Sequence, residues 1–153
     1  MFARLAFGSG IPAIMHHNRK ETTMNLFTIA QRQHLLINGQ PEQRGKDHKP
    51  VVKLFMQCSG CTWLLTELEP ELPTIAFGLC DLGMGFPELG YVDLEELAKV
   101  KNRFGLGIER DLQFEGKYPI SVYARAARHH QYIIESDGVL QRYTLGNLVT
   151  TRV

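Results

Sequence analysis

Two cysteines, Cys58 and Cys61, form a C-x-x-C pair, the first feature of this 153-residue sequence that could do chemistry. A structural zinc site needs four ligands, usually thiolates and imidazoles, and only Cys80 and His48 are suited to complete one. A redox pair lies at a helix N-terminus, where the helix dipole lowers a thiol pKa, but a strand is predicted after Cys61. We therefore favour a plain hairpin turn without a cofactor, and keep a metal site and a redox pair as alternatives.

The middle of the chain is acidic. Between Leu54 and Ala98 lie eight acids and no lysine or arginine, a formal charge of −8; all 17 basic residues and the other eight acids lie outside, which leaves +9. The net charge of +1 conceals this segregation. Gathered on one face, the acids could imitate nucleic-acid phosphates and occupy a basic surface of another protein. This acidic face is predicted to contain Glu67, Glu69, Glu71, Asp81, Glu88 and Glu95.

Two other interpretations of the acids stay open. One is a solvated surface on which Asp93 and Glu96 only cap a helix. The other is a metal-dependent enzyme or a metal-bound domain. Its divalent cation would bind the carboxylates of Glu67, Asp81, Glu109 and Asp111. No spacing motif supports such a site and no nucleophile–base–acid constellation can be recognised, so an enzyme is not predicted.

Arg110 lies between Glu109 and Asp111 in the chain. A guanidinium that turns inward commonly forms a bidentate pair with a buried carboxylate, through two parallel hydrogen bonds. We therefore expect Arg110 to pair with Glu67 or Asp81 inside the protein, in preference to binding a ligand.

Cations gather near the predicted last helix. Arg125 and Arg128 share one helix face and Lys117 lies close before it, so these three side chains could contact phosphates. A solvated helix is favoured, because phosphate footprints use more cations than this. Weak nucleic-acid binding is thus a third candidate function.

Hydrophobic periodicity predicts the elements that must position these residues. Short apolar runs predict strands over 51–57, 61–69, 74–81 and 107–115, and the short links between the first three predict an antiparallel meander. Thr28 and Gln31 have capping-box spacing, which predicts a helix that ends at a left-handed Gly39.

Two further helices are predicted, one capped by Asp93 and one from near Ser121. The glycine-rich stretch 82–90 is predicted to be a loop, and Asp137-Gly138 predicts a closing hairpin. The core of the sheet is expected to contain Trp63, Leu65, Phe55, Ile75, Phe77, Leu79, Ile108 and Leu112.

These elements predict an α+β fold: a central, mainly antiparallel sheet of four or more strands, with an N-terminal helix and two further helices covering one face. The domain is expected over 24–130, with a hairpin extension over 131–153. Residues 1–23 lack periodicity and are expected to be a disordered leader or a mis-called start before Met24. With no membrane-length apolar run and no secretory signal, the cytoplasm is the expected location.

Four blocks, "LLINGQ", "VVKLFMQCSGCTWLLTELEPE", "IAFGLCDLGMGFPELGYVDLEEL" and "GLGIERDLQFE", resemble in this order the bacterial domain of unknown function twenty-nine fifty-eight. The resemblance runs from Leu26 to about Arg128. It implies no established activity, only an accessory protein of plasmids and integrative elements. With the acidic middle, it leads us to expect a cytoplasmic accessory protein of a mobile genetic element that binds a protein partner with a basic surface, such as a nucleic-acid-handling protein that it inhibits.

Overall fold

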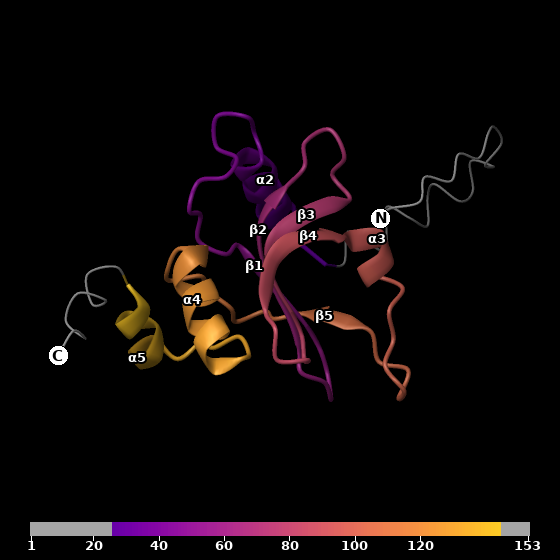
Figure 1. Ribbon diagram of the computed structural model, residues 1–153. Helices are drawn as coiled ribbons and strands as arrows, with labels where there is room; N and C mark the ends of the chain where they lie inside the picture. Colours follow the sequence, from indigo (N-terminus) through magenta and orange to yellow (C-terminus); the bar gives the residue numbers. More distant parts are fainter. Residues whose placement is uncertain (1–25, 145–153) are drawn as a thin grey trace, which may run out of the picture.

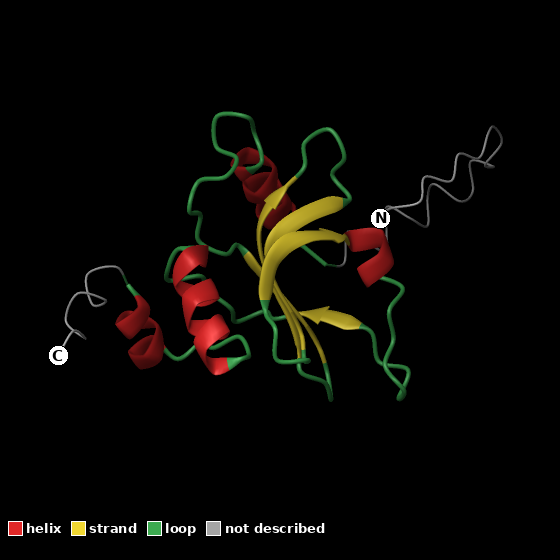
Figure 2. Ribbon diagram, viewed as in Figure 1, coloured by secondary structure: helices red, strands yellow, loops and turns green. Residues whose placement is uncertain are grey.

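A computed structural model describes residues 26–144, which form a five-stranded antiparallel sheet with helices packed on it (Figure 1). The strand order is β4-β3-β2-β1-β5, so the α+β prediction is confirmed (Figure 2). In chain order the elements are α2 (Ile29–Asn38), β1 (Val52–Met56), β2 (Cys61–Leu68), β3 (Ile75–Leu82), β4 (Glu88–Asp93), α3 (Leu94–Leu97), β5 (Ile108–Arg110), α4 (Ile120–His130), α5 (Asp137–Leu140) and the 3-10 helix η1 (Gln141–Tyr143). Within the described residues, no helix is both long and apolar enough to cross a membrane.

The central strand β2 explains why helices occupy both faces of the sheet. Trp63, Leu64 and Leu65 are consecutive and all buried, although neighbouring side chains of a strand point to opposite faces. Trp63 and Leu65 join a core with α2 and α3, and Leu64 joins a second core with α4. One covered face was expected; two are observed, because an uninterrupted apolar run needs cover on each side.

Helix α2 begins with the predicted capping box. The main-chain N–H of Thr28 donates to Oε1 of Gln31 at 2.9 Å, and the N–H of Gln31 donates to Oγ1 of Thr28 at 3.1 Å. The predicted left-handed end is wrong, because Gly39 has φ −80°. Glycine is needed there for space, since a Cβ would lie 1.9 Å from the carbonyl oxygen of Leu68.

A β-bulge in β2 anchors the C-terminal end of α2. The pairing of β2 with β3 shifts register between Leu65 and Glu67, which places Thr66 in the bulge. Its carbonyl oxygen accepts a buried hydrogen bond from Nδ2 of Asn38 at 2.9 Å. The last residue of α2 is thereby fixed to the centre of the sheet.

Strand β4 was not predicted. Part of it lies in the glycine-rich stretch 82–90, where Pro87 and Gly90 obscure the alternation of a strand, yet it pairs with β3 along its whole length. The predicted cap of the next helix is confirmed, because a carboxylate oxygen of Asp93 accepts from the N–H of Glu95 at 2.8 Å.

The strand predicted over 107–115 is much shorter than expected. After β5, a carboxylate oxygen of Asp111 accepts from the N–H of Gln113 at 2.9 Å, which turns the chain away from the sheet. Leu112 was expected in the core and is 81% exposed, so that prediction is wrong.

The predicted hairpin at Asp137-Gly138 is also wrong, because this dipeptide begins α5. Leu140 is buried against α4, and the hydroxyl of Tyr118 donates to a carboxylate oxygen of Asp137 at 2.6 Å. The segment after α4 therefore extends the helix core instead of pairing as strands. The leader expected over 1–23 and residues 145–153 of the expected extension lie outside the described residues.

Candidate functional site

Strand β4 is one edge of the sheet among the described residues. The N–H of Leu94 donates to the carbonyl of Thr74 at 2.8 Å, and hydrogen-bonded and non-hydrogen-bonded pairs alternate along an antiparallel ladder. By this alternation and the register of β4 with β3, the main-chain groups of Leu89 and Tyr91 point away from the sheet. Both residues present an N–H and a carbonyl that another strand could use.

The two edges of the sheet differ in how they are protected. β5 has three residues, and two of them, Glu109 and Arg110, are charged. β4 has six residues, and residues 89–92 at its centre carry no charge and no proline. Native sheets commonly blunt their edges with short strands, charges or proline. β4 has none of these at its centre and is therefore open to strand addition.

Helix α4 packs on one face of the sheet, next to β3 and β4 (Figure 1). Its apolar stripe packs against Leu64 and Leu79 and consists of Ile120, Val122, Tyr123, Ala126 and Ala127. Ala124 and Arg128 are four residues apart and therefore follow one another along the helix surface that faces β4.

Asp81 fixes the end of α4 relative to the sheet. Its side chain lies at the end of β3 and is only 2% exposed. One carboxylate oxygen accepts from the N–H of Gly83 at 2.9 Å, and the other accepts from the N–H of Ile133 at 3.0 Å. One buried carboxylate therefore holds both the connection into β4 and the segment that follows α4.

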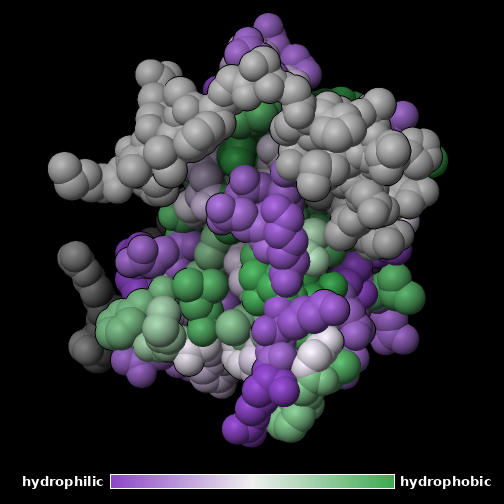
Figure 3. Space-filling model, turned by 90° about the vertical axis from the view of Figure 1, so that its right-hand side faces the viewer, coloured by the Kyte–Doolittle hydropathy of each residue, from purple (hydrophilic) through white to green (hydrophobic). Residues whose placement is uncertain are grey.

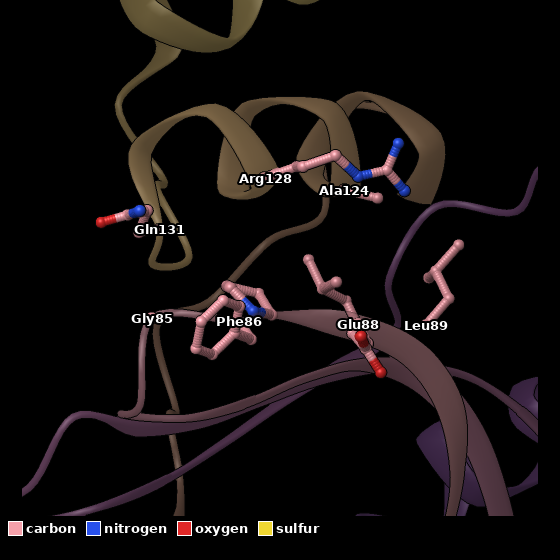
Figure 4. A pocket seen from close by; sticks show the side chains of 9 residues that line it. Gly85, Phe86, Glu88, Leu89, Ala124, Arg128 and Gln131 are labelled. Atoms are coloured by element: carbon pink, nitrogen blue, oxygen red, sulfur yellow. The ribbon is translucent and has the colours of Figure 1, made fainter.

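An open groove of about 430 Å³ lies between β4 and α4. It is lined by Leu79, Gly85, Phe86, Pro87, Glu88, Leu89, Ala124, Arg128 and Gln131. Figure 4 shows Leu89 directed toward the helix and the guanidinium of Arg128 extended along the groove. The carboxylate of Glu88 points to the opposite side of the strand, so Arg128 is the charged lining group directed over the groove.

Large apolar side chains are exposed along this edge. Phe86 is 78% exposed, Tyr91 63% and Leu89 44%, and Met84 in the connection before β4 is also exposed. Apolar groups that gather in this way commonly mark an interaction site. Sequence reasoning missed Phe86, Leu89 and Tyr91; the signal that could have found them is the uncharged run 89–92, which includes the strand-forming residues Tyr91 and Val92.

The acids predicted to form one face are divided between the interior and several surfaces. Glu67 is 5% exposed, and its carboxylate accepts from the N–H of Gly45 at 3.2 Å. Glu67 and Asp81 are therefore wrongly assigned to an exposed face, because main-chain donors hold both carboxylates in buried positions. Glu69 forms an ion pair with Arg44.

Three predicted acids remain outside these contacts: Glu71 between β2 and β3, Glu88 on β4 and Glu95 on α3. Figure 3 views the side of the molecule that carries α3, where hydrophobic side chains reach the surface between hydrophilic ones. The acidic character of the mid-chain sequence is therefore spread over several elements.

Arg110 does not pair with Glu67 or Asp81. It lies on β5 opposite Leu54, whose side chain belongs to the core with α2. Both expected carboxylates are occupied by main-chain N–H groups, as described above. The predicted buried pairing is wrong, because β5 joins the sheet at β1 and not beside β2 or β3.

Lys53 forms the main ionic network of the α4 face. Its ammonium lies 3.1 Å from a carboxylate oxygen of Asp111 and also pairs with Glu135. Burial alone would lower the pKa of Lys53, but the two carboxylates outweigh it and raise the pKa above its ordinary value. The N–H of Gln113 and the nearby ammonium lower the pKa of Asp111. This network ties β1 to the segment after α4.

The four carboxylates considered as a cation site have separate partners. Asp111 pairs with Lys53, and Glu109 accepts from Nε2 of Gln57 at 3.0 Å, while Glu67 and Asp81 accept main-chain N–H groups. In the part of the chain that the structure describes, no three His, Cys, Asp or Glu side chains are grouped to hold a metal ion.

The three cysteines lie around the β1–β2 hairpin and β3. The hairpin turn is confirmed: Cys58 is exposed within it, and Cys61 begins β2, where its thiol donates to the carbonyl of Leu82 at 3.4 Å. Burial raises the pKa of the Cys80 thiol to about 11, so it stays protonated at neutral pH. All three are free thiols.

The three predicted phosphate contacts lie in different places. Arg125 donates from Nε and Nη2 to the carbonyl of Tyr143 at 3.0 and 2.8 Å, which fixes η1 against α4. Lys117 borders another pocket, together with Asp111 and Glu135. Arg128 alone lies at the groove beside β4, so the three cations do not form one phosphate-binding surface.

A family model described as a protein of unknown function (DUF2958) matches residues 26–134. No curated protein and no solved structure matches the chain. The matched segment contains both β4 and α4, and so both walls of the groove.

Proposed function

The chain belongs to the DUF2958 family, and we propose that it is a binding protein that holds an extended segment of a partner protein along β4. The observation that carries the proposal is that no strand of the described residues pairs with the outward side of β4, which lies beside a groove whose second wall is α4. An added strand would exchange main-chain hydrogen bonds with Leu89 and Tyr91, and its alternate side chains would enter the groove.

The groove is suited to this role because its walls are already fixed. The buried carboxylate of Asp81 holds the connection into β4 and the end of α4, and the apolar stripe of α4 packs on the sheet. A partner segment would therefore be ordered on binding while the groove itself would change little, which lowers the cost of association.

The setting of this activity is proposed from the family resemblance alone. It is the cytoplasm of a bacterium that carries a plasmid or an integrative element, where the chain would act as an accessory protein of the mobile DNA. A host defence or DNA-processing protein that the chain inhibits is one class of partner consistent with that setting.

A partner with a basic surface is a second candidate. Glu71 and Glu88 are exposed and have no ion pair among the described residues, so they are available to cations. Changing both to glutamine should weaken such a complex and reduce its salt dependence. Unchanged binding would exclude this second surface.

A displayed library of random peptides of strand length tests the main proposal. Peptides selected on the full chain should lose at least about tenfold in affinity for the variant Leu89→Pro, because proline removes an outward N–H and obstructs the neighbouring strand. The inward ladder to β3 keeps its donors, so the fold should be retained, which circular dichroism checks.

Arg110→Pro is the matched control, because Arg110 occupies the equivalent outward position on the opposite edge of the sheet. It should leave peptide affinity unchanged. Amide hydrogen exchange on the wild-type chain gives a second readout, in which bound peptide should protect Leu89 and Tyr91. Equal affinity for both proline variants, without such protection, would rule out strand addition at β4.

A further inference from the structure

We propose that the segment held along β4 carries an acidic side chain whose carboxylate binds the guanidinium of Arg128. This inference rests on the proposed function, because it names the chemical class of the segment that the same groove accepts. Side chains of an added strand face α4 at alternate positions. The segment would therefore place the acid and one or more apolar residues on the side that faces the helix.

Arg128 provides the charge for this contact. Its guanidinium extends along the groove in Figure 4 and has no acceptor among the described residues. The carboxylate of Glu88 is directed away from the groove and leaves the charge of Arg128 uncompensated. A guanidinium presents five N–H donors in a planar fork, which matches a carboxylate with two parallel hydrogen bonds.

Arg125 shows that α4 uses its two arginines differently. Arg125 donates from two nitrogens to the carbonyl of Tyr143 and so has a structural partner. Arg128 is exposed and stands beside an apolar floor formed by Leu79 and Leu89. An arginine held over apolar groups loses less hydration on pairing than a lysine would, which favours a carboxylate-bearing peptide.

A phosphate chain is the other anion that an arginine commonly binds, and the groove suits it less well. A nucleic-acid footprint uses several cations along the backbone, whereas the charged lining group directed over this groove is Arg128. Lys117 and Arg125 lie elsewhere, as described above. The strand edge and the apolar floor match a polypeptide, which supplies main-chain hydrogen bonds and apolar side chains together.

Peptides selected from the displayed library supply the probes for the test. An acidic binder is synthesised together with two matched forms in which its acid is changed to the amide or to lysine. The variant Arg128→Glu should bind the acidic peptide about tenfold more weakly, and the lysine form should regain affinity for this variant. Arg142→Glu makes the same charge change on η1 outside the groove, and should alter affinity by less than about twofold.

The outcomes separate this inference from the proposed function. Peptides that bind wild type and Arg128→Glu equally, while Leu89→Pro still abolishes binding, overturn the carboxylate contact and leave strand addition in place. A selection that yields no peptide overturns both. Tighter binding of a single-stranded oligonucleotide, with affinity that falls steeply with salt, would assign the groove to nucleic acid and also overturn the inference.

Discussion

Asp81 shows how one buried carboxylate can join two distant segments of the chain. Its position at the end of an apolar strand made it a candidate for an acidic surface or a cation site, because a sequence does not reveal which main-chain N–H groups will lack a partner. The structure supplies two such groups, from Gly83 and Ile133, and they come from segments about 50 residues apart in the chain.

The variant Asp81→Asn tests this role. An amide of nearly the same size has only one accepting oxygen, so one of the two N–H groups would face an NH₂ group instead. We expect the free energy of unfolding to fall by about 1–3 kcal/mol in a urea titration. Glu71→Gln, the same chemical change on an exposed side chain, should leave the midpoint unchanged. Equal midpoints for all three proteins would contradict the bracing role of Asp81.

The Lys53 network makes a pH prediction at the same scale. The folded pKa of Asp111 lies below its unfolded value of 3.8, so its contribution to stability is present above pH 3.8 and is lost as pH falls through the folded pKa. The side chain of Asp111 is partly exposed and solvent screens its ion pair, so the effect should be less than about 1 kcal/mol. Unfolding curves recorded between neutral and acidic pH should show a smaller decline for Asp111→Asn than for wild type, and identical declines would contradict the assignment.

At the scale of elements, sequence reasoning succeeded where a residue's role is local. The caps by Thr28 and Asp93 depend on hydrogen bonds within a few residues, and both were predicted. It failed for β4, which is held by pairing with β3, and for Gly39, whose requirement comes from the carbonyl of Leu68 on another element. Contacts between distant segments carry no signature in local spacing.

The packing of α2 on β2 leads to an element-scale prediction. Gly39→Ala would place a Cβ 1.9 Å from the carbonyl oxygen of Leu68, so α2 must shift from the sheet. The expected loss of stability is about 1–3 kcal/mol by thermal or chemical unfolding. Gly138→Ala is the matched control, because its Cβ would meet nothing within 4 Å in α5. A neutral Gly39→Ala would show that α2 has room to move.

At the scale of the molecule, two hydrophobic cores share the strand β2. The α+β class and the antiparallel meander followed from apolar runs and short links. The two-sided arrangement was not foreseen, because helices were expected on one face only and Leu64, on the other face of β2, was not included in the predicted core. The groove could not be predicted either, because it lies between α4 and the edge strand β4, which was not predicted.

A shared strand predicts a single unfolding transition. Leu35→Ala in the first core and Leu140→Ala in the second should each cost about 2–5 kcal/mol, and both should shift the same transition. The fluorescence of Trp63, the one tryptophan, reports on the first core, and circular dichroism reports on both. Coincident curves are expected. Separate transitions for the two probes would show that the cores fold independently.

The shortness and charge of β5 have a consequence for assembly. A sheet that can add strands at both edges can polymerise, because each added chain exposes a new edge strand for the next chain. Among the described residues, β4 is the edge strand without such protection, so a strand of a partner, or of a second copy of this chain, would occupy it on docking. We therefore expect a complex of fixed stoichiometry, and no growth of fibrils from the native sheet.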